Sequence, residues 1–193
     1  DNAGTIALAE CTCRKQMKLM GKGCDAPLEA CFMFGSMAEY YIDNGIGRRI
    51  DAGEALRIVR ECQEAGLVTQ PATSQNPSGM CNCCGDCCGV LGAIKANAKP
   101  AGHVFSNHFA EVNAGECTGC ALCEERCPMD AISMSSAGIA EVDLDRCIGC
   151  GLCAMKCPAD AILLREKSPD KKRPVPADTR EQMTLMAKQR RLI

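Results

Sequence analysis

Two runs of cysteine with the same spacing lie in the C-terminal half of the chain. The first run is Cys117, Cys120, Cys123 and Cys127, followed by Pro128, and the second is Cys147, Cys150, Cys153 and Cys157, followed by Pro158. Both read C-x2-C-x2-C-x3-C-P, a spacing that suits thiolate-bound [4Fe–4S] clusters. Iron held in this way exchanges single electrons, so the pattern predicts redox chemistry. Zinc is the alternative metal, and the duplication of the whole pattern argues against it.

The duplication extends beyond the cysteines. Residues 109–117 align with residues 139–147, and residues 127–132 align with residues 157–162. An internal repeat of this kind predicts two copies of one unit, here strand, cysteine loop, short helix and strand. Apolar or alternating patterns place the strands at residues 109–112, 132–134, 139–142 and 162–164, with a turn at 135–138.

On these motifs, residues 109–164 resemble the two-cluster bacterial ferredoxin family. The resemblance implies two [4Fe–4S] clusters related by a pseudo-twofold axis, with the fourth cysteine of each run binding the other cluster. Carried over, the first cluster takes Cys117, Cys120, Cys123 and Cys157, and the second takes Cys147, Cys150, Cys153 and Cys127. We expect Gly119, Gly149 and Gly151 to bring backbone amides close to cluster sulfurs, and Ile132, Ile148 and Ile162 to exclude water.

Ten further cysteines lie in the N-terminal half, nine of them in two groups. The first group is Cys11, Cys13, Cys24 and Cys31, and the second is Cys81, Cys83, Cys84, Cys87 and Cys88. Tight spacing of this kind suits a metal better than long loop-closing bridges. We therefore expect one or two further Fe–S clusters, one for each group in the simplest arrangement. A single cluster that draws on both groups, or one zinc site, stays open. Cys62 is expected to be an apolar core residue of a helix.

The order of these segments resembles a little-characterised group of iron–sulfur proteins from anaerobes. In that group, segments like Cys11-Thr-Cys13-Arg14, Gly21-Lys-Gly-Cys24-Asp25 and Cys81-Asn-Cys83-Cys84 precede a two-cluster ferredoxin. The resemblance implies that the N-terminal cysteines act together and does not supply a reaction. The Cys-Cys-Gly pairs are also similar to those of heterodisulfide reductases, although the long spacings of those domains are absent.

The expected fold class is α+β, a ferredoxin-like pseudo-twofold domain preceded by a small, mainly helical, cysteine-rich domain. The expected domains are the cysteine-rich domain at 1–98, a linker at 99–108, the ferredoxin domain at 109–164, and a basic tail at 165–193 with a docking helix. Helices are predicted at 38–44, at 51–65 with an Asp51–Glu54 capping box, at 89–98 and at 179–192, and a strand at 67–69. Helix, turn, helix and strand here resemble a winged-helix module.

Composition narrows the class of protein. The 193 residues include 18 Cys, but the start of the chain shows no signal peptide and ten Met fit a reduced interior, so a secreted disulfide scaffold is disfavoured. With no Trp, two Tyr and four Phe, the core is short of aromatics, and folding should depend on metal. No apolar stretch is long enough for a membrane span, so a cytoplasmic protein is expected. Because the chain begins with Asp, upstream sequence could be missing.

Charge is distributed unevenly and bears on partners. Residues 109–164 carry nine acidic and three basic residues, whereas residues 165–193 carry nine basic and four acidic ones. The basic tail suggests docking on a partner or on a second copy of the chain, and nothing beyond charge supports nucleic acid. Arg14, Lys15, Lys18 and Lys22 could offset the charge of an N-terminal cluster. His103 and His108 are expected to be polar surface, with iron ligation as the alternative.

The function expected from these features is electron transfer. The chain would relay single low-potential electrons through multiple [4Fe–4S] clusters, as a carrier or as a subunit beside a flavin- or metal-containing oxidoreductase. No nucleophile–base pair or nucleotide loop is visible, so no catalytic residue is assigned. Two alternatives remain: a reductase with a substrate-binding N-terminal cluster, and an Fe–S redox sensor that reads DNA.

Overall fold

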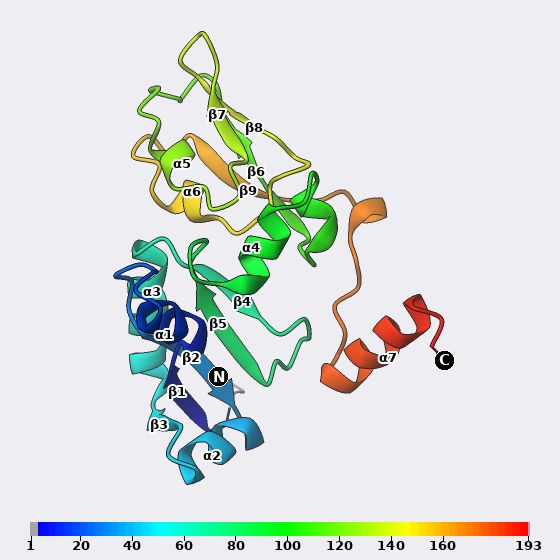
Figure 1. Cartoon of the computed structure of the whole chain (residues 1–193). Coiled ribbons are helices and arrows are strands. Elements are labelled where there is room, and N and C mark those ends of the chain that lie inside the picture. Colours follow the sequence, from blue (N-terminus) through cyan, green and yellow to red (C-terminus); the bar gives the residue numbers. More distant parts are fainter. Residues whose placement is uncertain (1–3, 193) are drawn as a thin grey trace. The chain divides into compact units, whose positions relative to one another are not determined.

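The computed structural model describes residues 4–192, which divide into two compact units. The first unit runs to Cys83 and is taken up again from Pro174, and the second unit comprises Cys84–Arg173. The first unit is therefore built from two separated stretches of chain, with the whole of the second unit between them in the sequence (Figure 1).

A five-stranded antiparallel sheet forms the body of the first unit. Its strands, in spatial order, are β3 (Gly47–Ile50), β1 (Ile6–Glu10), β2 (Glu29–Phe34), β5 (Gly79–Cys83) and β4 (Val68–Pro71). Register is fixed by apolar residues in the middle of the sheet, where Leu8 of β1 lies opposite Phe32 of β2. Both side chains are buried. A slip of one residue would move them to the opposite face, so burial specifies the pairing.

Three helices accompany this sheet. They are α1 (Thr12–Leu19), α2 (Ser36–Asp43) and α3 (Ala52–Glu64). Helix α2 contacts β1, β2 and β3, while α3 contacts β1, β2, β4 and β5. Ile58 and Cys62, one helical turn apart, are the buried residues of α3. The predicted capping box is confirmed, because the Asp51 side chain accepts a hydrogen bond from the Glu54 N–H at 2.7 Å.

The expectation of a mainly helical N-terminal half is wrong, since a mixed unit with an antiparallel sheet is found. Strands β1, β2, β3 and β5 were not predicted, because cysteines and glycines interrupt the alternation that marks a half-buried strand. The winged-helix arrangement is not met either: between α2 and α3 lies β3, an edge strand of the sheet. Leu56 is exposed because it lies two residues from the buried Ile58 and so on the other side of α3.

A buried polar network links α1 to the sheet. Arg14 of α1 has no exposed surface, and its guanidinium donates to the backbone oxygens of Asn82 (3.0 Å) and Pro27 (3.2 Å). Asn82, equally buried, donates through its side chain to the Ala30 oxygen and accepts from the Thr69 hydroxyl. Buried polar groups are costly unless paired, so this network holds α1 against β2, β4 and β5.

The C-terminal segment completes the first unit. Pro176 and Ala177 accept hydrogen bonds from the backbone N–H groups of Gln75 (2.8 Å) and Asn76 (3.2 Å), in the loop between β4 and β5. Helix α7 (Thr179–Gln189) follows, capped by Asp178, whose side chain accepts from the Glu181 N–H at 2.9 Å. The helix predicted in the tail is thus confirmed.

The second unit consists of short elements joined by cysteine loops. In chain order they are α4 (Gly89–Lys95), η1 (Pro100–His103), β6 (His108–Val112), α5 (Leu122–Glu125), β7 (Ile132–Met134), β8 (Ala140–Val142), α6 (Leu152–Met155), β9 (Ile162–Glu166) and η2 (Pro169–Lys171). Strand β6 pairs with β9 and β7 pairs with β8, both antiparallel, which confirms the four strands predicted from the repeat.

The repeat in sequence is a repeat in conformation. The Asn113 N–H donates to the Ala161 oxygen, and thirty residues later the Asp143 N–H donates to the Ala131 oxygen, both at 2.8 Å. Asp130 and Asp160, also equivalent positions, both adopt positive φ, at 50° and 49°. The two copies therefore make the same turns, and each copy bonds to a segment of the other.

Residues that precede β6 pack on this repeated core. Lys95 of α4 pairs with Asp130 at 2.8 Å, and Lys99 pairs with Asp145 at 2.7 Å. The Arg146 guanidinium donates to the Met129 oxygen at 2.8 Å. These contacts make α4 part of the second unit. Along residues 4–192, no helix has both the length and the apolar character that crossing a membrane requires.

Candidate metal centres

Two cavities in the second unit are each lined by four cysteines. One cavity is lined by Cys127, Cys147, Cys150 and Cys153. The other is lined by Cys117, Cys120, Cys123 and Cys157. Each cavity thus combines three cysteines of one run with the fourth cysteine of the other run. The structure brings together the same two sets of four that the sequence resemblance implied.

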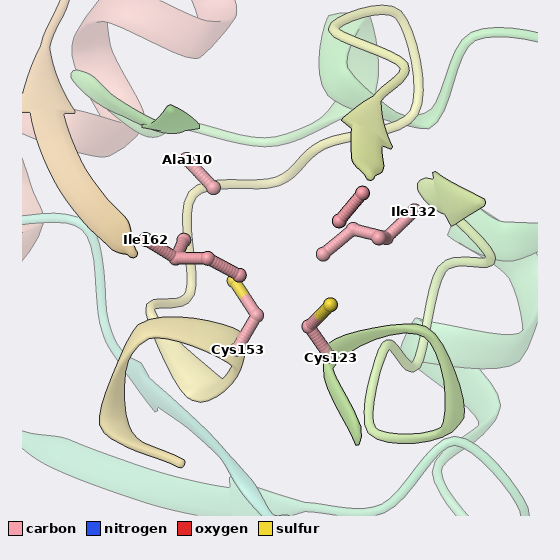
Figure 2. Close-up of a cluster of buried hydrophobic side chains, with 6 residues drawn as sticks. Ala110, Cys123, Ile132, Cys153 and Ile162 are labelled. Atoms are coloured by element: carbon pink, nitrogen blue, oxygen red, sulfur yellow. The ribbon is translucent and has the colours of Figure 1, made fainter. Parts of the chain in front are cut away.

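The walls of both cavities are apolar. Ile132 and Ile148 line the first cavity and Ile162 lines the second, and all three side chains are buried as predicted. Figure 2 shows Cys123 and Cys153 projecting from the two short helices into the space that Ile132 and Ile162 border. The core of this unit is therefore made largely of cysteine, alanine and isoleucine, and it is the same region that encloses the cavities.

Backbone amides point at the cysteine sulfurs in a repeated pattern. The Ala131 N–H donates to Cys127 Sγ at 3.2 Å, and the equivalent Ala161 N–H donates to Cys157 Sγ at 3.3 Å. The Ala110 N–H donates to Cys147 Sγ at 3.5 Å. Hydrogen bonds of this kind stabilise negative charge on sulfur, so the loops are arranged to hold thiolates.

Burial and crowding oppose ionisation of these thiols in the absence of a cation. Burial raises the pKa of Cys150 to about 11, and the nearby thiols of Cys127 and Cys147 add to the shift. Burial and the same neighbours, with Cys150, raise the pKa of Cys153 to about 12. By contrast, the backbone N–H of Ala140 lowers the pKa of Cys117. Four thiolates can share such a cavity only if bound metal neutralises them.

Glycine is required immediately before the second cysteine of each run. Gly119 and Gly149 both have positive φ, at 70° and 67°. A Cβ atom on Gly149 would lie 2.2 Å from the His108 oxygen, and one on Gly119 would lie 2.6 Å from the Gly138 oxygen. The loop backbone therefore passes against the start of β6 at one site and against the turn between β7 and β8 at the other, and only glycine fits there.

The two cavities differ in access to solvent. Cys120 is exposed, whereas its equivalent Cys150 is only partly exposed. Leu122, which lines the same cavity as Cys120, is 45% exposed. The loop that holds Cys120 is thus the place where a cysteine that lines one of the cavities comes nearest to the surface.

Four of the N-terminal cysteines form a row in the first unit. The side chain of Cys31 lies within hydrogen-bonding reach of those of Cys11 and Cys81, and that of Cys81 within reach of Cys83. Two of these residues belong to the first group predicted from the sequence and two to the second. Hydrogen bonds to Cys11 and Cys81, and then burial, raise the pKa of Cys31, while the Cys31 and Cys83 thiols lower that of Cys81 to about 3.

The remaining N-terminal cysteines lie elsewhere in the two units. Cys13 is exposed on α1, and Cys24 is half-buried in the loop that follows α1. Cys84, Cys87 and Cys88 are buried in the second unit, with the sulfurs of Cys84 and Cys87 within 4.8 Å of each other. The Cys88 sulfur accepts from the Leu91 N–H at 3.5 Å and caps α4. No disulfide joins any of the cysteines within residues 4–192.

Other residues singled out in the sequence have varied surroundings. Cys62 is completely buried on α3, as expected for a core residue, and burial raises its pKa to about 11. Of the four basic residues after Cys11, Arg14 is buried, whereas Lys15, Lys18 and Lys22 are exposed. His103 is exposed, and half-buried His108 lies 4.0 Å from Glu166.

Comparison with known protein families agrees with the geometry of the second unit. A family model described as a 4Fe-4S dicluster domain matches residues 116–161, the segment that contains both cysteine runs. The chain therefore contains a 4Fe–4S dicluster domain. No curated protein matches the chain. The matched segment is less than a third of the sequence, so the comparison defines this domain and leaves the sheet unit without a named family.

Proposed function

We propose that this protein is an iron–sulfur electron carrier, or the electron-transfer subunit of an oxidoreductase, with two [4Fe–4S] clusters in its second unit. The observation that carries the proposal is the pair of cavities, each lined by four cysteines drawn from both runs. The dicluster family match supports the same function.

The residues fit two clusters in number, chemistry and surroundings. A [4Fe–4S] cluster takes four thiolates, and each cavity offers four cysteine side chains against an apolar wall. In this proposal Cys117, Cys120, Cys123 and Cys157 hold one cluster, and Cys147, Cys150, Cys153 and Cys127 hold the other. The two loops are then related by a pseudo-twofold axis, for which the shared turns at Asp130 and Asp160 are supporting evidence.

The polypeptide would tune the redox chemistry. When bound, a cluster of this type takes up and releases one electron at a time, commonly at low potential. The N–H groups of Ala131 and Ala161 donate to Cys127 and Cys157, which favours the more negative, reduced state of the site they face. Ile132 and Ile162 keep water away and lower the local dielectric, which opposes that added charge. The potential reflects the balance of these two effects.

Electrons would enter or leave near Cys120. Its side chain is exposed and also lines that cavity. Glu116, Glu124 and Glu125 are exposed on the same loop and helix. A redox partner with a basic surface would meet complementary charge there, which favours encounter more than tight binding.

Anaerobic analysis of the full chain tests the proposal. We expect about eight irons and eight sulfides from the dicluster unit, and after reduction an electron paramagnetic resonance spectrum of two interacting [4Fe–4S] centres. Rapid mixing with a one-electron acceptor should restore the oxidised visible spectrum in two one-electron steps. A folded, iron-free protein, or iron that cannot be reduced and reoxidised, would overturn the proposal.

The wider role is part of the same proposal. The sequence lacks a recognisable nucleotide or flavin motif, so a separate oxidoreductase would supply or consume the electrons. The basic C-terminal segment, residues 165–193, is a candidate docking arm for that partner or for a second copy. Co-purification at low and high salt of the parent chain and of a variant with the basic residues of 165–193 replaced by glutamine tests this arm, and unchanged association of the variant would contradict it.

A further inference from the structure

From the row of cysteines in the first unit we infer a further metal centre, separate from the dicluster domain, bound by Cys11, Cys31, Cys81 and Cys83. The class of ligand is a thiophilic metal, either an iron–sulfur cluster or a single zinc ion, since both take four thiolates. The set mixes the two cysteine groups of the sequence. Strand pairing, rather than spacing along the chain, would assemble the site.

The sheet register brings three of the four residues together. Cys31 of β2 lies directly opposite Cys81 of β5. Directly opposed residues in an antiparallel pair place their Cβ atoms about 5 Å apart on one face. Cys83 is two residues beyond Cys81 on the same strand, so it points to the same side. This alternation puts the sulfurs on the face opposite to Phe32, which belongs to the apolar core.

The fourth residue comes from the start of α1. Cys11 follows β1, where the pairing with β2 shifts between Ala9 and Glu10. The backbone N–H of Cys11 donates to the Leu28 oxygen at 2.7 Å, which fixes the residue beside the beginning of β2. Its side chain is buried and within reach of Cys31. The irregular pairing thus turns the chain so that a residue outside the strand joins the row.

A buried cation accompanies the row. The guanidinium of Arg14 is fully buried, and its Nη2 atom donates to the backbone oxygen of Asn82, the residue between Cys81 and Cys83. A buried charge is stabilised by an opposite charge nearby. Four thiolates with one divalent metal carry a net charge of about −2, and Arg14 would offset part of it.

The row of cysteines has two simpler explanations, ordinary core packing and a disulfide, and neither accounts for all four residues. Cysteine as ordinary core would not place four sulfurs in a row and a guanidinium beside them, and Cys31 and Cys81 are themselves only partly buried. A Cys31–Cys81 disulfide is compatible with directly opposed strands, but would leave Cys11 and Cys83 without a role. The metal proposal is therefore the one that uses all four residues.

Metal analysis of full-length variants, purified without oxygen, tests the inference. We expect the double variant Cys31→Ser with Cys81→Ser to lose about four irons with their sulfide, or about one zinc, relative to the parent protein. The iron and the resonance signals of the dicluster unit should remain. A matched control is Cys62→Ala, which changes a fully buried cysteine outside the row and should keep all the metal. Unchanged metal content in the double variant would overturn the inference.

Alkylation of the unmodified protein gives a second test that does not depend on variants folding. Cys31 and Cys81 are partly exposed, so iodoacetamide can reach them in the native state, and a dependence of their reaction on chelator reports bound metal. If they bind metal, peptide mapping should find them protected until a chelator is added, and reactive afterwards. Reaction without chelator, or recovery of a Cys31–Cys81 disulfide from anaerobic protein, would contradict the site. If Cys31 and Cys81 are protected until chelator is added but the protein holds no dicluster iron, this inference stands and the function proposed above is contradicted.

Discussion

Cys127 lines the same cavity as Cys147, although the two belong to different cysteine runs. Cys157 in the same way lies with the first run. Each copy of the repeat therefore supplies the last cysteine of the other copy's set. A chain arranged in this way cannot complete one set of four while the other half is unfolded, so both halves should form together.

Paired substitutions test this exchange of cysteines. The variant Cys117→Ser with Cys157→Ser changes one cavity only, and we expect it to lose about four irons. The variant Cys117→Ser with Cys127→Ser changes both cavities and should lose about eight. Iron analysis and electron paramagnetic resonance of anaerobic protein give the measurement. The reverse order of losses would show that each run binds its own cluster.

The loop glycines offer a matched pair for testing close packing. Gly149→Ala puts a Cβ atom 2.2 Å from the His108 oxygen, and should destabilise the second unit by roughly 2–5 kcal/mol. Gly151→Ala meets nothing nearer than 3.5 Å, and Ala121 already occupies the equivalent position at φ 61°. Its cost should be only about 1 kcal/mol. Loss of visible absorbance in guanidinium compares the two, and equal midpoints would count against the close approach.

Removal of iron should unfold the second unit. The buried side chains of its core are those of Cys123 and Cys153 together with alanine and isoleucine, so little apolar area is buried without metal. After anaerobic chelation we expect hydrogen exchange in β6, β7, β8 and β9 to approach that of an unfolded chain. Persistent protection of these strands in iron-free protein would mean that the unit folds on side-chain packing alone.

The N-cap of α3 can be tested in the first unit. Asp51→Ala removes the acceptor for the Glu54 N–H and should lower the free energy of unfolding by about 1 kcal/mol. Asp51→Asn keeps an acceptor, so most of that stability should be retained. Urea denaturation followed by far-ultraviolet circular dichroism measures both variants. An alanine variant as stable as the parent would show that tertiary packing alone holds the helix.

Surface charge near Cys120 should set the rate of reaction with a cationic partner. Glu124→Gln is expected to slow electron transfer to a positively charged acceptor by roughly twofold to threefold at low ionic strength. The difference should shrink as salt is added, because exposed charges are screened. Glu141→Gln makes the same change of charge on exposed β8, outside both cysteine loops. Equal effects of the two substitutions on the rate in stopped-flow measurements would show that electrons are not transferred near Cys120.

Much of the second unit could be predicted from its sequence, because each motif occurs in both copies of the repeat and the two copies can be compared. Strands at 109–112 and 162–164 were located by the alignment of the copies, and the observed β6 and β9 extend them by one and two residues. The sets of four cysteines followed from the family resemblance rather than from spacing alone. That Cys127 lies beside Cys147 depends on how two distant loops pack, which local pattern does not specify.

The first unit was harder to predict for the opposite reason. The Asp51–Glu54 cap is a local interaction, and it was found. The row of cysteines depends on β2 and β5 being neighbours, and these strands come from distant parts of the chain. The sequence marked Arg14 as a basic residue close to cysteines, but it did not indicate that the side chain is completely buried. Alternation of Ala30 and Phe32 around Cys31 was the one hint of a strand there.

The division of the first unit into two stretches of chain has a consequence for biosynthesis. The segment that carries Pro176 and Ala177, which bonds to the loop after β4, is translated after the whole dicluster unit. Its partners are translated well before the dicluster unit. The loop between β4 and β5 therefore lacks these two hydrogen bonds until the inserted unit has been synthesised, so the dicluster unit can begin to take up iron before the first unit is complete.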